Sequence, residues 1–550
     1  MTDDQALYAR RWWTLAVLCL SLLIIFVGNS SLNVAIPTLS KVLHASTSQL
    51  QWVVAAYSLV FAGLLFTAGA LGDRFGRKGA LQFGLVGYLC GATLASTATA
   101  MWQLIASRAL MGGCAAFIMP STLSILVNVF PAEERTKAIA IWAGVTGAAG
   151  AIGPVASGWL LGHFWYGSVF FVNVPIIVCA LIAGFFLVPK SKDPEEGRLD
   201  LVGAALSIAG ISSLVYGLIQ APERGWSSPA TIASFAAAAV VLSLFVVWER
   251  GRREPMLDMA YFRNPAFSTA TSGMILAFMS MFGVMFLITQ YFQLVLGYSP
   301  LSAALRLLPM APIMMIVSPL TPRIIARVGA NRTVAAGMSS IAIGFVAFLF
   351  LGLHTPYLYV LFCMIWLVSG IALTMSPMTA AIMSAVPPRR AGAGSAMNDA
   401  TRELGAAFGV AVLGSIAASR FSSGIQPAIA RLSPADRASA RASLGTALQT
   451  AARLPHDIAT QLVTTADKAF VSGVHLAALC GAVLATCSAI LVLRFLPRQI
   501  AQHGAVRGPL EAAEAAAELG LAGIPPVFAD TAADMQALLG SAGATDEAAG

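Results

Sequence analysis

The stretch GALGDRFGRK, residues 69–78, lies between two long apolar runs and joins them in very few residues. Glycine tolerates left-handed backbone angles, so Gly72 and Gly76 predict a tight turn between two helices. Asp73 is the only acidic residue of the stretch. Three basic residues follow it: Arg74, Arg77 and Lys78. A loop that merely carried positive charge at a membrane surface would need neither the glycines nor the aspartate, so this pattern predicts a loop with a specific role.

The composition of the whole chain indicates a membrane protein. Of its 550 residues, 58% are hydrophobic and only 11% are charged, whereas soluble domains carry about 25% charged residues. The net charge of +8 is spread too thinly to indicate a nucleic-acid partner. The seven cysteines lie within apolar runs without metal-ligand or disulfide spacing. We find no catalytic constellation and no phosphate-binding Gly-Lys-Ser/Thr loop, so we expect no enzyme activity, no metal, no cofactor and no ATP-driven pump.

Apolar segments of spanning length recur along the chain. A helix that crosses a bilayer needs about 20 mainly apolar residues. The sequence therefore predicts an all-α membrane protein with fourteen spans. They cover residues 14–36, 51–71, 80–99, 103–128, 138–160, 168–188, 200–219, 230–248, 266–291, 302–322, 334–353, 357–383, 397–419 and 470–494.

The distribution of Lys and Arg predicts how these spans are oriented. With the N-terminus in the cytoplasm and the spans alternating, the basic residues concentrate in the cytoplasmic segments. The short segments of the other side carry only Lys41 and Arg224, and the remaining positive charges there fall in one long loop, residues 422–469. The positive-inside rule therefore predicts a multi-pass protein of the cell (inner) membrane with both termini in the cytoplasm.

Two charged linkers divide the spans into groups of six, two and six. Residues 1–188 are predicted to form a first six-helix bundle, and residues 189–265 two inserted helices with their linkers. Residues 266–496 are predicted to form a second six-helix bundle that includes the long outer loop 422–469, in which we expect short helices. The tail, residues 497–550, is rich in Ala and Glu, and we expect it to be disordered in the cytoplasm.

Four stretches together resemble the major facilitator superfamily, in particular its fourteen-helix drug:proton antiporters of the EmrB/QacA type. Residues 69–78 match the superfamily pattern G-x-x-x-D-R-x-G-R-K. Residues 166–175 keep the F-x-x-N-x-P part of the antiporter signature W-R-x-x-F-x-x-N-x-P, with Tyr-Gly in place of Trp-Arg. Residues 290–309 and 398–405 match the same family closely. The resemblance runs from about residue 13 to 495 and implies two bundles that rock about a central site.

The resemblance implies roles for two motifs. Asp73 would lock the cytoplasmic side by engaging the neighbouring half. The gating loop would consist of Gly69, Gly72, Asp73, Arg74, Gly76 and Arg77. The fifth predicted span resembles the antiporter motif G-P-x-x-G-G, although Ser157 replaces its first terminal glycine, and small residues at this spacing also suit a generic close helix contact. The motif residues are Gly147, Gly150, Gly153, Pro154 and Gly158.

Charged residues within the spans are candidates for proton coupling, because a charge there is costly unless it faces a partner or a cavity. Arg108 lies about five residues into the fourth predicted span and resembles an arginine that the superfamily uses in coupling; alternatively, it snorkels to the outer surface. Asp399, Arg402 and Glu403 share one helix face, near the cytoplasmic edge of the thirteenth span. Two interpretations are open. Either Asp399 or Glu403 exchanges protons there, or the three charged side chains neutralise one another.

The first predicted span departs from the family pattern. Relatives carry an aspartate at the position of Gly28, so a role in cation or proton binding does not carry over to this helix. Polar side chains remain nearby, and they bind substrate or contact a neighbouring helix. The substrate-cavity candidates are Asn29, Asn33, Gln290 and Arg306. Methionines are abundant in spans nine to twelve and suit either an adaptable apolar pocket or an ordinary core.

These features predict a proton-coupled secondary transporter that exports small apolar or amphipathic compounds by alternating access. Its partners are expected to be the small-molecule substrate, protons and the lipid bilayer, and a monomer is expected to suffice. A facilitator or metabolite transporter of narrow specificity with the same fold is an alternative, since the acid of the first helix is missing. A transporter-like sensor or scaffold is a more remote one.

Overall fold

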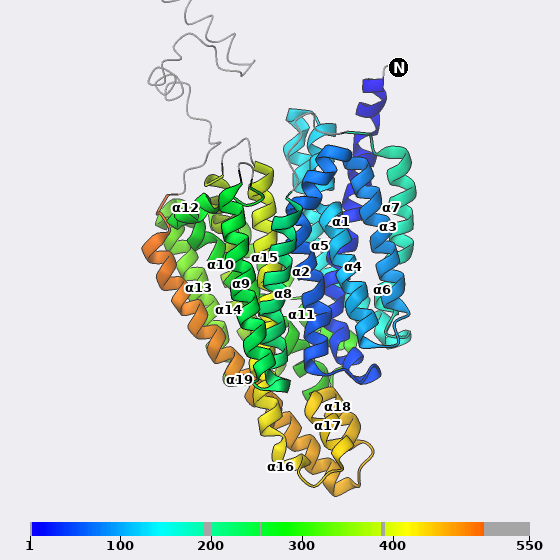
Figure 1. The fold of residues 1–550 in the computed structure, drawn as a ribbon, viewed down its shortest axis with the longest axis vertical. Coiled ribbons are helices and arrows are strands. Elements are labelled where there is room, and N and C mark those ends of the chain that lie inside the picture. Colours follow the sequence, from blue (N-terminus) through cyan, green and yellow to red (C-terminus); the bar gives the residue numbers. More distant parts are fainter. Residues whose placement is uncertain (1–2, 192–199, 253–254, 387–390, 500–550) are drawn as a thin grey trace, which may run out of the picture. The chain divides into compact units, whose positions relative to one another are not determined.

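The computed structural model describes residues 3–191, 200–252, 255–386 and 391–499. All regular structure within these residues is helical, as the sequence predicts. The predicted tail lies almost entirely outside the described residues, as does most of the charged linker before residue 200. Figure 1 shows long helices that run side by side.

The first helices of the chain pack against one another and form what we call the first bundle. Its elements are α1 (Asp3–Val42), α2 (Thr47–Phe75), α3 (Arg77–Ser96), α4 (Met101–Val129), α5 (Ala132–His163), α6 (Ser168–Phe171) and α7 (Asn173–Leu187). Within it, α4 packs on α2 and α3, and α1 packs on α5 and α7. Ser46 begins α2 with a capping box, in which its side chain accepts from the backbone of Gln49 and the Gln49 side chain accepts from the backbone of Ser46.

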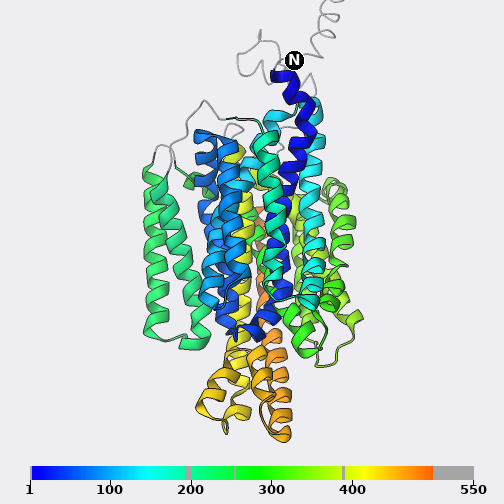
Figure 2. The ribbon, with the colours of Figure 1, turned by 90° about the vertical axis from the view of Figure 1, so that its right-hand side faces the viewer.

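Two further helices, α8 (Leu201–Arg224) and α9 (Pro229–Gly251), form a hairpin. The helix α8 contacts both α2 and α15, so the hairpin lies beside the junction of the two bundles, and Figure 2 shows it at the edge of the helix assembly. The second bundle is formed by the 3-10 helix η1 (Met259–Arg263), α10 (Pro265–Gln290), the π-helical η2 (Tyr291–Val295), α11 (Pro300–Leu307), α12 (Met310–Val328), α13 (Ala330–Phe348), α14 (Tyr357–Ser384), α15 (Ala391–Gly424) and α19 (His456–Phe495).

Twelve helices among the described residues are long and apolar enough to cross a membrane. They coincide with twelve of the fourteen predicted spans, several of which are joined or broken locally, as where α6 meets α7. The other two predicted spans are present as the helices α5 and α13, which pack within their bundles. The structure thus confirms the helical architecture, and the count of fourteen spans stays a prediction.

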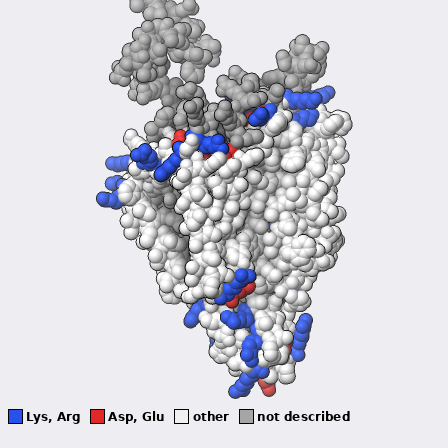
Figure 3. All heavy atoms as spheres, viewed as in Figure 1, with Lys and Arg blue, Asp and Glu red and all other residues white. Residues whose placement is uncertain are grey.

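The two ends of the helices differ in what they carry. One end, which we call the basic face, carries residues 72–78 and the last turn of α12. The opposite end, which we call the loop face, carries the turn between α1 and α2 and the short helices α16 (Gln426–Ile429), α17 (Pro434–Ala442) and α18 (Leu444–Ala451). These helices confirm the expected helical pieces of the long loop. In Figure 3, charged side chains gather at the two ends and the surface between them is almost free of them.

Close backbone contact joins α10 to α15 in the second bundle. A Cβ atom at Gly409 would collide with the carbonyl of Met279 and lie 2.9 Å from the amide nitrogen of Gly283. Gly405, one turn earlier, would place a Cβ 2.7 Å from the carbonyl oxygen of Ile275. Small residues of this kind let membrane helices approach at van der Waals distance, where dispersion stabilises the pair.

We therefore expect Gly409→Ala to destabilise the protein by about 1–3 kcal/mol, the usual cost of overpacking. The measurement is the thermal unfolding midpoint of the purified protein in detergent. Gly144→Ala is the matched control, because a Cβ at Gly144 has no heavy atom within 4 Å and alanine favours a helix over glycine. Equal midpoints for the two variants would contradict this packing account.

Candidate functional site

The stretch 69–78 forms a sharper corner than the sequence predicts. Helix α2 continues to Phe75 and α3 begins at Arg77, so Gly76 alone joins them, with a φ of 114° that suits glycine. The expectation that Gly72 also shapes the turn is wrong. Gly72 lies inside α2, where a Cβ would sit 3.2 Å from that of Ala80, so its role is close packing.

Asp73 and Lys78 at this corner each bind a residue of the first bundle. Asp73 accepts from Nε of Arg77 at 2.7 Å, one helical turn away across Gly76. The backbone amide of Arg77 donates to the carbonyl of Ser191 at 2.9 Å, and Nζ of Lys78 donates to the carbonyl of Phe185 at 2.6 Å. The corner is therefore tied to the end of α7 and the residues that follow it. The predicted contact of Asp73 with the neighbouring half stays a prediction.

Arg108 is completely buried, which excludes the alternative that it snorkels to a surface. Its Nε donates to the carbonyl of Val53 at 3.2 Å, and one terminal nitrogen donates to Oδ1 of Asn29 at 3.1 Å. The guanidinium also lies 4.3 Å from the ring centroid of Tyr57, close enough for a cation–π interaction. Helices α1 and α2 thus hold the charge of α4 in place. Among the described residues, nothing hydrogen-bonds its other terminal nitrogen.

The carboxylates of α15 lie well within that helix. Helix α15 begins at Ala391, so Glu403 is about 18 Å along it at 1.5 Å per residue. Asp399 lies 3.7 Å from Arg402, and Glu403 lies on the same helix, which packs on α2 of the first bundle. Glu403 as a whole is partly exposed, whereas its Oε2 is buried and has no hydrogen-bond partner among the described residues. The predicted three-residue cluster therefore contains an ion pair, Asp399 and Arg402, and a carboxylate outside that pair.

The residues of the antiporter motif divide between two partners. Ser31 donates to the carbonyl of Gly153 at 2.9 Å, and Ser157 donates to the carbonyl of Ser31 at 2.9 Å, so this part of α5 binds α1. Gly158 faces the second bundle, where its Cβ would lie 2.7 Å from Cα of Leu301 at the start of α11. Gly147 and Pro154 lie within the same continuous helix.

The two bundles meet at the loop face and diverge toward the basic face. Along α5, Gly158 touches α11, but a Cβ at Gly150 or Gly144 would have no heavy atom within 4 Å. Helix α12 continues α11 toward the basic face and makes few contacts with α5. Its side chains are exposed there, with Met315 at 75%. The backbones of α5 and α11 are therefore in contact at the loop face, and this contact does not continue along α5 at Gly150 or Gly144.

The predicted cavity residues do not form one group. Asn29 binds Arg108, and Asn33 is 8% exposed, with an Oδ1 that has no partner among the described residues. Gln290 donates to the carbonyl of Phe286 in its own helix. Arg306 lies 3.9 Å from the ring centroid of Tyr298 and also faces Tyr357, within the second bundle. Of the four candidates, only Asn29 and Asn33 therefore lie on α1, the helix whose Asn29 binds Arg108.

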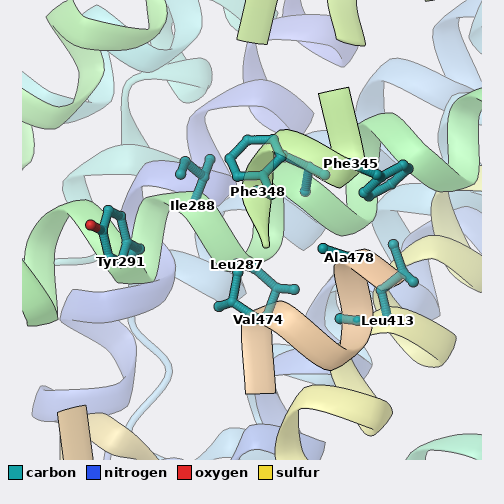
Figure 4. Close-up of a pocket in the computed structure, with 10 residues that line it drawn as sticks. Leu287, Ile288, Tyr291, Phe345, Phe348, Leu413, Val474 and Ala478 are labelled. Atoms are coloured by element: carbon teal, nitrogen blue, oxygen red, sulfur yellow. The ribbon is translucent and has the colours of Figure 1, made fainter. Parts of the chain in front are cut away.

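A small apolar pocket lies inside the second bundle, between α10, α13, α15 and α19 (Figure 4). Leu287, Phe345 and Val474 are among its lining residues. None of the predicted cavity residues and no methionine lines it. Met274 and Met378 are fully buried, which favours an ordinary core role for these two side chains.

Sequence reasoning missed residues that the structure places at the junction. Tyr57 supports Arg108, and its hydroxyl is buried without a hydrogen-bond partner among the described residues. Gln51 and Gln293 each donate a hydrogen bond to the other bundle. The available signal was a polar side chain within or just beside an apolar run, which is expensive unless it has a partner. Their partners are backbone carbonyls, which no sequence pattern marks.

Two packed bundles of membrane-length helices, one of which holds a buried charge, are typical of membrane transporters. The model of the Major Facilitator Superfamily matches residues 18–410. The chain belongs to this family, and it is a multi-pass membrane transporter.

Relatives of known description cover most of the chain. The multidrug efflux pump LfrA of Mycolicibacterium smegmatis is 36% identical over 484 residues, which are 88% of this chain and 96% of LfrA. The multidrug resistance protein Stp of Mycobacterium tuberculosis is 33% identical over 422 residues, 76% of this chain and 78% of Stp. The tetracenomycin C resistance and export protein of Streptomyces glaucescens is 30% identical over 498 residues, 89% of this chain and 92% of that protein.

Solved structures agree on the fold. A bacterial homologue of the human lysosomal transporter Spinster, in an inward-facing and unoccupied conformation, superimposes with a TM-score of 0.60. The match covers 88% of this chain and 98% of that one at 15% sequence identity, and it therefore shows the shared fold alone.

The hydrogen bond between Asn29 and Arg108 can be tested through stability. A bond to a charged group contributes about 1.5–3 kcal/mol, so we expect Asn29→Leu to lower the unfolding midpoint measurably. Asn29→Asp keeps the acceptor and adds an attractive charge, and we expect it to unfold no earlier than the wild type. Thermal unfolding of both variants in detergent is the measurement. An Asn29→Leu protein as stable as Asn29→Asp would show that this contact contributes nothing.

Proposed function

We propose that the chain exports small apolar or amphipathic compounds in exchange for protons, by alternating access between its two bundles. The proposal starts from Arg108 of α4, a charge completely buried among the helices of the first bundle, and from Glu403 of α15, the helix of the second bundle that packs on α2. We infer that these two opposite charges attract each other across the junction. The relatives described as efflux and export proteins support the direction of transport. The chain is a transporter that works without enzyme chemistry and as a monomer.

The charge pair gives proton binding a mechanical consequence. Glu403 is partly exposed, and we propose that a proton reaches its carboxylate from the basic face. Its Oε2 is buried and has no hydrogen-bond partner among the described residues. Protonation removes the negative charge that attracts Arg108 across the junction. Arg108 itself stays fixed by Asn29 and Val53. The change therefore alters how strongly the bundles are held together, which is what a two-state transporter requires.

The orientation follows from charge. We propose that the basic face lies in the cytoplasm and the loop face outside, because the positive-inside rule assigns basic segments to the cytoplasm. Both termini then lie in the cytoplasm, and the protein resides in the cell (inner) membrane. The conformation described above would be open to the cytoplasm, ready to receive a substrate. For Asp73 we propose a lock that engages the second bundle when this side closes.

Efflux from cells tests the proposal. Cells that express the chain should extrude lipophilic cationic and neutral dyes, and a protonophore should abolish the extrusion. We expect Arg108→Ala to reduce efflux to the background level while the protein remains in the membrane, because it removes the partner of Glu403. Arg431→Ala, at an exposed arginine of the long loop, is the control and should export normally.

Two results would contradict the proposal in different ways. Efflux that ignores the protonophore would exclude proton coupling. If no dye leaves the cells although the protein is present in the membrane, the substrate range is narrow, and the proposal of a multidrug exporter fails in favour of a metabolite transporter.

A further inference from the structure

Two buried glutamine side chains join the bundles near the loop face in a reciprocal manner. Gln51 of α2 is fully buried, and its Nε2 donates to the carbonyl of Val410 in α15 at 2.8 Å. Gln293 of η2 is 7% exposed, and its Nε2 donates to the carbonyl of Val34 in α1 at 2.9 Å. Each bundle thus contributes one amide donor and one backbone acceptor to the other.

Atoms of α15 pack closely around the side-chain amide of Gln51. Its Nε2 also lies 3.3 Å from Oγ of Ser415. A Cβ atom at Gly414 would collide with this nitrogen, so the absence of a side chain there makes room for the amide. The Gln51 Oε1 has no hydrogen-bond partner among the described residues. A buried amide in such surroundings loses much if its hydrogen bonds to α15 are broken without water to replace them.

A second layer covers these bonds at the loop face. The segment between α15 and α19, residues 425–455, which we call the strap, belongs to the second bundle in sequence but docks on the first. The hydroxyls of Ser40 and Ser443 are 3.0 Å apart, and Ser443 also bonds the carbonyl of Ala45. Ser40 is completely buried by this contact, and a Cβ at Gly445 would collide with its hydroxyl. Figure 1 shows α17 and α18 of the strap beyond the ends of the first bundle.

We propose that the contact between the two bundles at the loop face acts as a gate. Gln51 and Gln293 hold this gate closed, and the strap covers it. Both sets of contacts connect groups that move apart when the bundles separate on this side, so opening requires that they break. The free energy of the two amide bonds then sets how often the gate opens. This inference rests on the proposed alternating access, and its first test needs no transport.

The first test measures the opening of the gate directly. Ser40→Cys places a thiol at a fully buried position, so its reaction with a maleimide reports separation of the strap from α1. The protein is labelled in detergent, and mass spectrometry of the peptide around position 40 excludes the native cysteines. Adding Gln51→Met or Gln293→Met should raise the labelling rate roughly threefold to tenfold, the effect of one lost hydrogen bond.

Gln290→Met is the matched control for this labelling. It lies in the helix that leads into η2 and is also buried, but its amide donates to the carbonyl of Phe286 in its own helix. We expect it to leave the labelling rate of Ser40→Cys unchanged. Equal rates in Gln51→Met, Gln293→Met and Gln290→Met would overturn the assignment of the two fastening residues.

The second test locks the strap. Side-chain oxygens 3.0 Å apart place the Cβ atoms of positions 40 and 443 within reach of a disulfide. We expect oxidised Ser40→Cys/Ser443→Cys protein in liposomes to lose transport at least tenfold, and a reductant to restore it. Each single variant should transport under oxidising conditions. Normal transport by the fully cross-linked protein would overturn the role of the strap, whereas failure of the wild-type protein to transport any dye in the same liposomes would instead overturn the proposed export function.

Discussion

A permanently charged guanidinium buried among membrane-length helices is the constraint on which the rest of the site depends. A charge at this depth costs roughly 3 kcal/mol or more unless the protein compensates it. Asn29, Val53 and Tyr57 compensate Arg108 from two neighbouring helices and fix its position in the first bundle. Glu403 lies on α15 of the second bundle, the helix that packs on α2. Under the proposal made above, a change in the charge of Glu403 alters the attraction that this fixed arginine exerts on the second bundle.

The packing of the bundles determines from which side this charge pair can be reached. At the loop face, backbone contact at Gly158 and the amide bonds of Gln51 and Gln293 join the bundles. Toward the basic face, a Cβ atom at Gly144 or Gly150 would meet no heavy atom from outside its own helix within 4 Å among the described residues. Glu403 is partly exposed. We propose that protons and substrate both enter from the basic face in this conformation, which is the arrangement that an exchanger needs if the two are to alternate.

Much of the fold could be predicted from the sequence, because each span is a long apolar segment that can be recognised without knowing which helices it packs against. The site was only partly predictable. Arg108 was found because charge is rare in such segments. Asp399 and Glu403 could not be told apart from the sequence, and the structure shows that Asp399 pairs with Arg402. Gln51 was missed because its acceptor is a backbone carbonyl of α15. Every residue has such a carbonyl, so the sequence does not show which one will accept a hydrogen bond.

The most direct test of coupling between the bundles is proton movement through purified protein in liposomes. A pH-sensitive dye reports proton flux when an exported compound is added on the side of the basic face. The account predicts substrate-induced proton flux for the wild type and none for Glu403→Gln, which keeps the size of the side chain but cannot change its charge. Substrate should still bind to Glu403→Gln, because the rest of the junction is unaltered. Equal proton flux in the two proteins would contradict the central claim that Glu403 and Arg108 couple proton binding to transport.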